Sequence, residues 1–143
     1  MSPRTGQSWN NGPVAKTRAI QALERAGVPF QVHYYHVDSA DGPYGEAVAE
    51  AVGVKGDRMF KTLIASVDGR PMVGIVPVER QLSLKALAKV ASGKRAHMVE
   101  SRDAERLTGY VVGGISPFGR TRKLPVFLDQ SALDHETVYV SGG

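Results

Sequence analysis

The stretch MFKTLIASVDGRPMVGIVPV, residues Met59–Val78, decides the fold because it predicts a β-hairpin. Its two halves, Met59–Val67 and Met72–Val78, are rich in the apolar and β-branched side chains that strands favour. Between them stands Asp68-Gly69, a dipeptide suited to the tight turn of a hairpin. The two halves are therefore expected to pair antiparallel.

The elements outside this hairpin predict a mixed α/β domain. Apolar residues at helical spacing, with Gly or Ser at the expected caps, indicate helices, and short β-branched runs indicate further strands. The expected helices are Pro13–Ala26, Tyr44–Val52, Ser83–Ala91 and Ser101–Leu107; the expected strands are Val28–Val37, Tyr110–Val112, Leu124–Leu128 and Thr137–Val140.

Length and composition limit the class of protein. A chain of 143 residues with 42% hydrophobic and 22% charged residues suits one globular domain. No apolar run approaches the roughly 20 residues of a membrane span. There is no cysteine, which excludes disulfides and thiolate metal sites and favours the cytoplasm. Residues 1–12 have the composition of a flexible lead-in, which leaves 13–143 as the domain.

Positive charge is concentrated in one region of the chain. Residues Arg80–Lys123 contain ten Lys or Arg against three Asp or Glu, whereas the remainder contains eight against eleven. A one-sided basic region favours a polyanionic partner, and nucleic acid is the first candidate. For any single lysine here, the solvated face of a helix is the simpler interpretation.

The common hydrolase and nucleotide-binding motifs are missing. The sequence has no GxxxxGK[ST], HExxH or GxSxG pattern. His33 and His36 are three residues apart in a predicted strand, so their side chains would point to opposite faces and would not share a metal ion. The sequence therefore predicts neither a metal site nor a cofactor.

Lys61 is the first candidate site residue. Period-two alternation places it on one face with Leu63, Ala65 and Val67, so its ammonium would lie near apolar neighbours. One interpretation is a lysine that extends to the surface from a strand end. The other is a cation in a partly dry pocket, where it would bind a phosphate or carbonyl oxygen with little screening by water.

The second candidate is the stretch TGYVVGGISPFGRTRKLPVFLD, Thr108–Asp129. Its glycines, Gly113 and Gly114, let the backbone turn and approach a ligand, and Pro117 stiffens the exit, so free N–H groups could face an oxygen. Three cations follow at a spacing that could hold phosphates: Arg120, Arg122 and Lys123. An ordinary glycine-rich turn is the alternative.

Three stretches together resemble the YbaK family of trans-editing aminoacyl-tRNA deacylases, relatives of the editing insertion domain of prolyl-tRNA synthetase. They are Phe60–Gly69, Thr108–Asp129 and Thr137–Gly143, in the family's order, within a resemblance that begins near Val14. The resemblance implies a single compact α+β domain with an antiparallel-rich, barrel-like sheet and flanking helices. It also implies a cytoplasmic enzyme that needs no cofactor and removes a wrong amino acid from tRNA.

The resemblance also assigns roles to residues. Lys61 matches the essential lysine, which would hold the terminal nucleotide or the developing charge. The substrate-binding positions would be Tyr35, Thr62, Gly113, Gly114, Ile115, Ser116, Pro117, Ser141 and Gly142, and the tRNA-binding positions Arg120, Arg122 and Lys123. In the closest branch of the family the substrate is tRNA specific for proline that carries cysteine, and the cysteine thiol attacks its own ester. Prolyl-tRNA synthetase is then a candidate partner.

The sequence departs from the family pattern at its end. Family members usually continue beyond the SGG motif into a further strand and helix, whereas this sequence ends at Gly143. The resemblance thus predicts a domain without those elements and leaves a second function class open, a noncatalytic tRNA-binding or synthetase-associated module. A nucleotide-binding protein is a weaker third, because no Walker lysine-serine pair or acidic metal ligand accompanies the glycine-rich loop.

Overall fold

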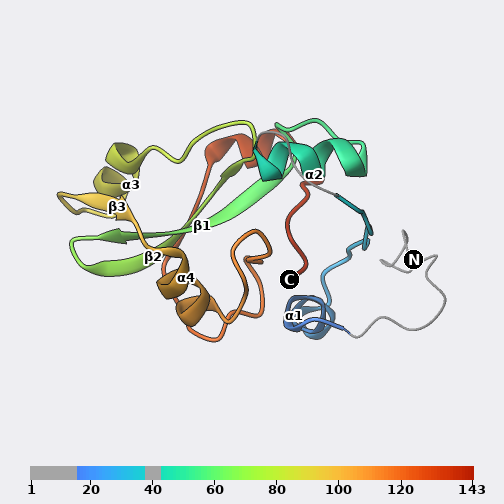
Figure 1. Ribbon diagram of the computed structural model, residues 1–143, viewed down its shortest axis with the longest axis horizontal. Helices are drawn as coiled ribbons and strands as arrows, with labels where there is room; N and C mark the ends of the chain where they lie inside the picture. The colour runs from blue at the N-terminus through green and yellow to red at the C-terminus, as the bar shows by residue number, and fades with distance from the viewer. Residues whose placement is uncertain (1–15, 38–42) are drawn as a thin grey trace.

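The computed structural model describes residues 16–37 and 43–143, and Figure 1 shows their arrangement. The expected lead-in, residues 1–12, and the expected helix start at Pro13 lie outside the described residues. The elements in chain order are α1 (Arg18–Ala26), α2 (Tyr44–Val52), β1 (Phe60–Val67), β2 (Arg70–Pro77), α3 (Leu84–Val90), β3 (Ala96–Met98), α4 (Ser101–Thr108), β4 (Val126–Leu128) and the 3₁₀ helix η1 (Gln130–Asp134). The mixed α/β class is confirmed.

The predicted hairpin is confirmed and forms the centre of the sheet. β1 and β2 pair antiparallel over their full length, from Phe60 opposite Pro77 to Val67 opposite Arg70. Asp68 and Gly69 both have positive φ, 50° and 84°, as a two-residue turn that matches the strand twist requires. The long hairpin therefore fixes where every other element can pack.

The sheet is mixed and open, with strand order β3-β1-β2-β4. β3 pairs antiparallel with only Ala65–Val67 of β1, and β4 pairs parallel with β2. The described residues do not close the barrel that the resemblance implied. Two short strands form its edges, and on the β3 side the neighbour of the start of β1 is the isolated bridge from Met59 to Tyr139.

Three of the predicted strands are wrong. Val28–Val37 joins no ladder although its composition suits a strand, because composition alone supplies no partner strand; Val37 packs on α2 instead. Tyr110–Val112 forms a turn, since Gly109 ends α4 in the left-handed region and Gly114 N–H donates to the Val111 carbonyl. Thr137–Val140 contributes only one bridge, between Met59 and Tyr139.

The predicted helices all form because their signals are local, but α1 begins at Arg18, so Lys16 and Thr17, which the prediction included, are not helical. The Thr17 hydroxyl accepts from Ile20 N–H at the start of α1, and the Ser83 hydroxyl accepts from Ala86 N–H at the start of α3. Gly27 and Gly53 end α1 and α2 in the left-handed region. No helix among the described residues is long and apolar enough to cross a membrane.

Apolar residues cover both faces of the hairpin. On one face, Ile64 and Val73 pack with α4, the start of α1 and Ile115 of the loop after α4. On the other, Ala65 and Met72 pack against α3. At the Phe60 end of β1, Met59 and Val78 pack against α2. Figure 1 shows α2 beside that end of the hairpin and α3 beside the opposite end.

Candidate functional site

Lys61 lies near the start of β1, opposite Val76. It is partly exposed, and it shares its face with Leu63 and Ala65, as the alternation predicted. Among the described residues no hydrogen bond or ion pair holds its ammonium group. On the β3 side of β1, Phe60 N–H donates to the Tyr139 carbonyl (2.8 Å) and the Ile64 carbonyl accepts from Val99 N–H (3.2 Å), so this free cation stands at a short gap in the edge between them.

The start of α2 lies at the same end of the hairpin as Lys61. Val78 N–H donates to the Met59 carbonyl (2.8 Å), and a Cβ placed on Gly45 would be 2.9 Å from Val78 Cγ1. The next residue toward the N-terminus, Tyr44, extends over the loop after α4: a Cβ placed on Gly113 would be 3.6 Å from Tyr44 Cε2. α2 therefore connects the strand that carries Lys61 with the glycine-rich loop.

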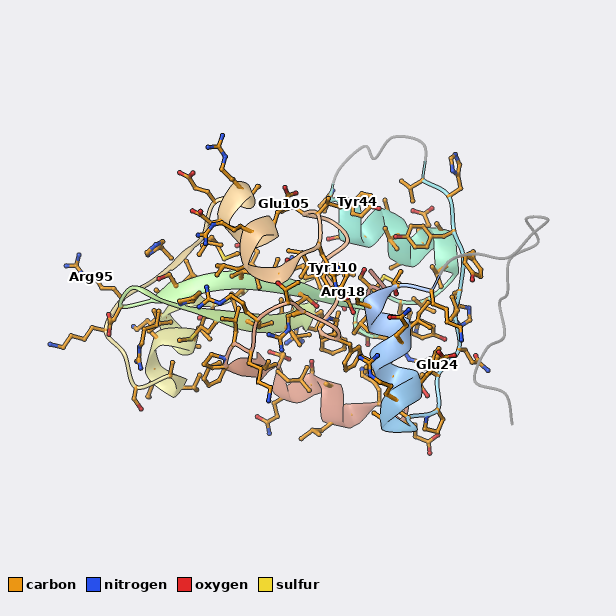
Figure 2. All side chains as sticks on the ribbon, turned by 90° about the horizontal axis from the view of Figure 1, so that it is seen from below. Arg18, Glu24, Tyr44, Arg95, Glu105 and Tyr110 are labelled. Carbon is orange, nitrogen blue, oxygen red and sulfur yellow. The ribbon has the colours of Figure 1, made fainter. Side chains whose placement is uncertain are left out.

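The glycine-rich loop, Gly113–Pro117, is held on the side of α4. The Glu105 carboxylate accepts a hydrogen bond from Val112 N–H (2.9 Å), and the Val111 carbonyl accepts one from Gly114 N–H (2.9 Å). Gly113 has φ of +94°, a conformation that side-chain-bearing residues rarely adopt. Figure 2 shows Glu105 and Tyr44 toward the same side of the sheet, where the loop passes between α4 and α2.

The second half of the loop is buried. Ile115 is part of the core, and Ser116 is fully buried, with its hydroxyl accepting from Phe118 N–H (3.2 Å). The Tyr110 hydroxyl donates to the Phe118 carbonyl (2.7 Å), which ties the two ends of the loop together. The loop is therefore a fixed structure and not an open flap.

Three backbone donors of this loop have no partner. Within residues 16–37 and 43–143, the N–H groups of Gly113, Ile115 and Ser116 donate no hydrogen bond. Unpaired N–H groups on a rigid loop are the donors that stabilise negative charge developing on an oxygen, because their orientation costs nothing at the moment of reaction. That these N–H groups face an oxygen of a ligand stays a prediction.

Two tyrosine hydroxyls lie next to the loop. Tyr35, which the resemblance had placed near the substrate, and Tyr44 are each nearly half exposed. Removal of its hydroxyl from water, together with the neighbouring Tyr44 hydroxyl, raises the pKa of Tyr35 to about 12. The Tyr35 phenol thus stays protonated at neutral pH and can donate a hydrogen bond to a ligand.

α1 fastens the loop from the other side. The Arg18 guanidinium donates from Nε to the Gly119 carbonyl (3.0 Å) and from Nη2 to the Gly109 carbonyl (2.8 Å). It also lies over the Tyr110 ring, 4.8 Å from the centroid. Figure 2 shows Arg18 and Tyr110 side by side. One side chain therefore joins the residues that precede and follow the Gly113–Pro117 loop.

The C-terminal site candidates lie against α1. The Gly142 carbonyl accepts from the Thr17 hydroxyl, and the Ser141 hydroxyl accepts from Gly143 N–H (3.1 Å). A Cβ on Gly143 would be 2.7 Å from the Tyr110 ring. These residues therefore approach the loop through Tyr110, which bonds to the Phe118 carbonyl.

The three cations after the loop do not act as one group. Arg120 points inward, where its guanidinium donates to the Pro117 and Arg122 carbonyls (3.2 Å each) and burial lowers its pKa. Arg122 and Lys123 are exposed, and Arg122 lines a hollow beside β2. Of the three, only Arg122 and Lys123 present their charge to solvent.

Neither Thr62 nor His33 contributes a polar side chain to the Gly113–Pro117 loop. Thr62 is buried on the opposite face of β1 from Lys61, with its hydroxyl unpaired. His33 lies against the Tyr139 ring. In the part of the chain that the structure describes, no group of three His, Asp or Glu side chains could hold a metal ion.

Comparison with known proteins identifies the family. Residues 42–143 match the aminoacyl-tRNA editing domain. The chain belongs to the aminoacyl-tRNA editing domain family. Within this family, the chain is 36% identical over 129 residues to EbsC of Enterococcus faecalis. The name of EbsC describes it, provisionally, as a Cys-tRNA(Pro)/Cys-tRNA(Cys) deacylase. The match covers 90% of this chain and 78% of EbsC.

Two further relatives agree with this family. The chain is 31% identical over 122 residues to the multifunctional Ser/Thr-tRNA deacylase ProXp-y of Escherichia coli K12, which covers 82% of this chain and 71% of that protein. A crystal structure described provisionally as a trans-editing enzyme for prolyl tRNA synthetase superposes with a TM-score of 0.71 at 24% identity, covering 88% and 78% of the two chains. That likeness confirms the editing-domain fold.

Sequence reasoning missed the residues that hold the family's glycine-rich loop in place. Arg18, Tyr44 and Glu105 all contact it from helices. Each stands in an ordinary amphipathic helix, where a charged or polar residue on the solvent side is the default interpretation. No signal in the sequence selects them, because their contacts depend on where the loop packs: Arg18 bonds to carbonyls 91 and 101 residues away, and Tyr44 lies over Gly113.

Proposed function

We propose that this protein deacylates mischarged aminoacyl-tRNA and that its substrate is tRNA specific for proline carrying cysteine. The observation that carries the proposal is the fixed loop whose exposed Gly113 has an N–H group without a partner among the described residues, beside the Tyr44 ring, with the Tyr35 hydroxyl next to Tyr44. Family membership and the deacylase names of two relatives support the same reaction.

The loop would bind the carbonyl oxygen of the aminoacyl ester. Its N–H groups would stabilise the negative charge that appears on this oxygen when the carbonyl is attacked. Lys61, whose ammonium has no partner among the described residues, would hold either the terminal nucleotide or the same developing charge. Ser141, Gly142 and Thr62 would complete the substrate pocket.

The reaction needs no nucleophile from the protein. In a cysteinyl ester, the substrate's thiol sulfur attacks its own carbonyl carbon and forms a cyclic thioester, while the bond to the tRNA oxygen breaks. The thiol proton ends on that oxygen, which leaves as the 3′-terminal hydroxyl. The protein contributes orientation and electrostatic stabilisation, which suits a site that has donors and a cation but no catalytic triad.

The test is release of amino acid from tRNA specific for proline charged with cysteine, alanine or serine. We expect the parent chain to release cysteine and spare alanine, because alanine has no side-chain nucleophile. Lys61→Ala should abolish release and leave the urea unfolding curve unchanged, whereas Lys85→Ala, on the exposed side of α3, should behave like the parent.

Other outcomes would change the proposal. Equal release of cysteine and alanine would exclude attack by the thiol, and preferential release of serine would move the chain toward the ProXp-y type of substrate. Binding of tRNA without release of any amino acid would favour the noncatalytic module. Unchanged turnover in Lys61→Ala would remove this lysine from the mechanism.

Two further assignments follow from the proposed reaction. The exposed cations Arg122 and Lys123 would contact tRNA phosphates, while Arg120 would keep the end of the loop in place. The protein would act in the cytoplasm, where tRNA is charged, and prolyl-tRNA synthetase is the candidate that would supply its substrate. Co-sedimentation with that synthetase, with and without charged tRNA, tests the association.

A further inference from the structure

The end of the hairpin away from Lys61 carries a second group of cations, which reaches the glycine-rich loop through Arg122, whose carbonyl accepts a hydrogen bond from Arg120. We define the basic end as Arg70, Lys94, Arg95 and Arg122, all exposed. Arg70 begins β2 just after the hairpin turn, Lys94 and Arg95 precede β3, and Arg122 lies in the segment before β4. Figure 2 shows Arg95 extending into solvent at this tip, on the opposite side of the view from Tyr44.

The hairpin turn organises these cations. The Asp68 carboxylate accepts hydrogen bonds from the backbone N–H groups of Lys94 (2.9 Å) and Arg95 (3.0 Å), which lower its pKa. The acid therefore holds the backbone of the neighbouring turn and leaves both side chains free. Among the described residues, none of the four cations forms an ion pair, so four positive charges stand against one carboxylate.

A hollow lies within the basic end. It has a volume of about 310 Å³ and is lined by Arg70 and Arg122 together with apolar side chains that include Pro71, Leu124 and Phe127. An arginine can bind a phosphate through two parallel N–H groups, and apolar and aromatic surface between two arginines suits a sugar or base. The chemistry of the hollow matches a nucleic-acid backbone.

The length of β1 limits what could contact both this end and the candidate site. Lys61 and Val67 are six residues apart in one strand, a separation of about 20 Å at about 3.3 Å per residue. A single aminoacylated nucleotide cannot span that distance, whereas a tRNA has a base-paired stem next to its 3′ end. One ligand could therefore occupy both places only if it is a polynucleotide.

We propose that the basic end binds backbone phosphates of the tRNA stem while the 3′ end occupies the loop site. This inference rests on the proposed function for the identity of the nucleic acid. It divides substrate recognition into two parts: the loop site reads the aminoacyl ester, and the basic end supplies affinity that is independent of the amino acid.

The test measures binding of uncharged tRNA by the double variant Arg70→Gln/Arg95→Gln at a series of salt concentrations. Each lost phosphate contact should reduce the slope of log affinity against log salt by about 0.7 to 0.9, so the double variant should lose about 1.4 to 1.8. The matched control, Arg25→Gln/Lys55→Gln, removes two exposed cations outside the basic end and should keep the slope of the parent.

A short substrate separates the two sites. An aminoacylated adenosine, the 3′-terminal nucleoside of tRNA, cannot span the distance of about 20 Å between Lys61 and Val67, so the parent and the double variant should deacylate it at equal rates. A salt slope equal to that of the parent, or an equal loss on the aminoacylated adenosine, would overturn the proposal. In a further outcome, the parent and the double variant bind tRNA with the expected salt slopes while the parent releases no amino acid. That result would support phosphate binding at the basic end and refute the proposed reaction.

Discussion

Replacement of Arg18 by alanine should loosen the loop on which the proposed reaction depends. The variant loses two hydrogen bonds from a charged group, to the Gly119 and Gly109 carbonyls, and the stacking on Tyr110. Because Arg18 is exposed, each bond is taken at about 1 kcal/mol, below the usual range for charged donors, and the stacking at about 0.5 kcal/mol. The expected loss is therefore about 2.5 kcal/mol in the free energy of unfolding.

Arg18→Lys is the informative companion variant. Lysine keeps the charge, but its single ammonium cannot reproduce the planar fork that reaches two carbonyls, so we expect about half of the loss. Lys16→Ala is the matched control. Lys16 lies two residues before Arg18 and forms an exposed ion pair with Glu24 (2.9 Å). Loss of this pair should cost about 0.5 kcal/mol or less.

Urea unfolding and deacylation kinetics together test this reasoning. If Arg18 positions the loop, Arg18→Ala should lower kcat under conditions where the variant is fully folded, and Arg18→Lys should restore part of it. An unfolding free energy within about 0.5 kcal/mol of the parent would refute the energetic argument. A normal kcat in a destabilised variant would show that Arg18 is structural only.

Two other predictions concern the same site. Gly119→Ala should destabilise the fold far more than Gly27→Ala, although both glycines have φ near +70°. A Cβ at Gly119 would be 2.6 Å from the Arg18 backbone, whereas a Cβ at Gly27 meets open space. Urea unfolding of both variants measures the difference in free energy of unfolding, and equal losses would contradict the close approach at Gly119. Since the pKa of Tyr35 is raised from 10 to about 12, its contribution to stability should be complete below pH 10 and disappear as the pH rises to about 12. The ultraviolet titration difference between the parent and Tyr35→Phe should accordingly have its midpoint near pH 12, and a midpoint near 10 would show that the hydroxyl is freely solvated.

The local elements were predictable because their determinants lie within a few residues. A cap hydroxyl at Thr17 or Ser83 satisfies an N–H three residues further on, and Asp68-Gly69 supplies the two positive φ values of the hairpin turn. The strand predictions that failed concern segments whose pairing depends on residues far away along the chain. Val28–Val37 has a favourable composition, but a strand also needs a partner strand along its length, and this segment joins no ladder while Val37 packs on α2.

The site itself was predictable in part. The family motifs gave Lys61 and the Gly113–Pro117 loop, and the structure leaves the ammonium and three loop N–H groups unpaired among the described residues. The spacing of Arg120 and Arg122 suggested one phosphate-binding group. Only the tertiary structure separates them, because the Arg120 guanidinium is used by loop carbonyls that the sequence does not place.

The sequence by itself therefore determined the helices, the hairpin and the family, since these depend on caps, periodicity and short motifs. The tertiary structure alone decided that Arg18 bonds to carbonyls 91 and 101 residues away and that Tyr44 covers Gly113. It also decided that Arg70 lies with Lys94 and Arg95 at the other end of the hairpin from Lys61. The physical reason is that a polar side chain can satisfy any nearby unpaired backbone group, and the packing of the helices on the sheet determines which groups come near.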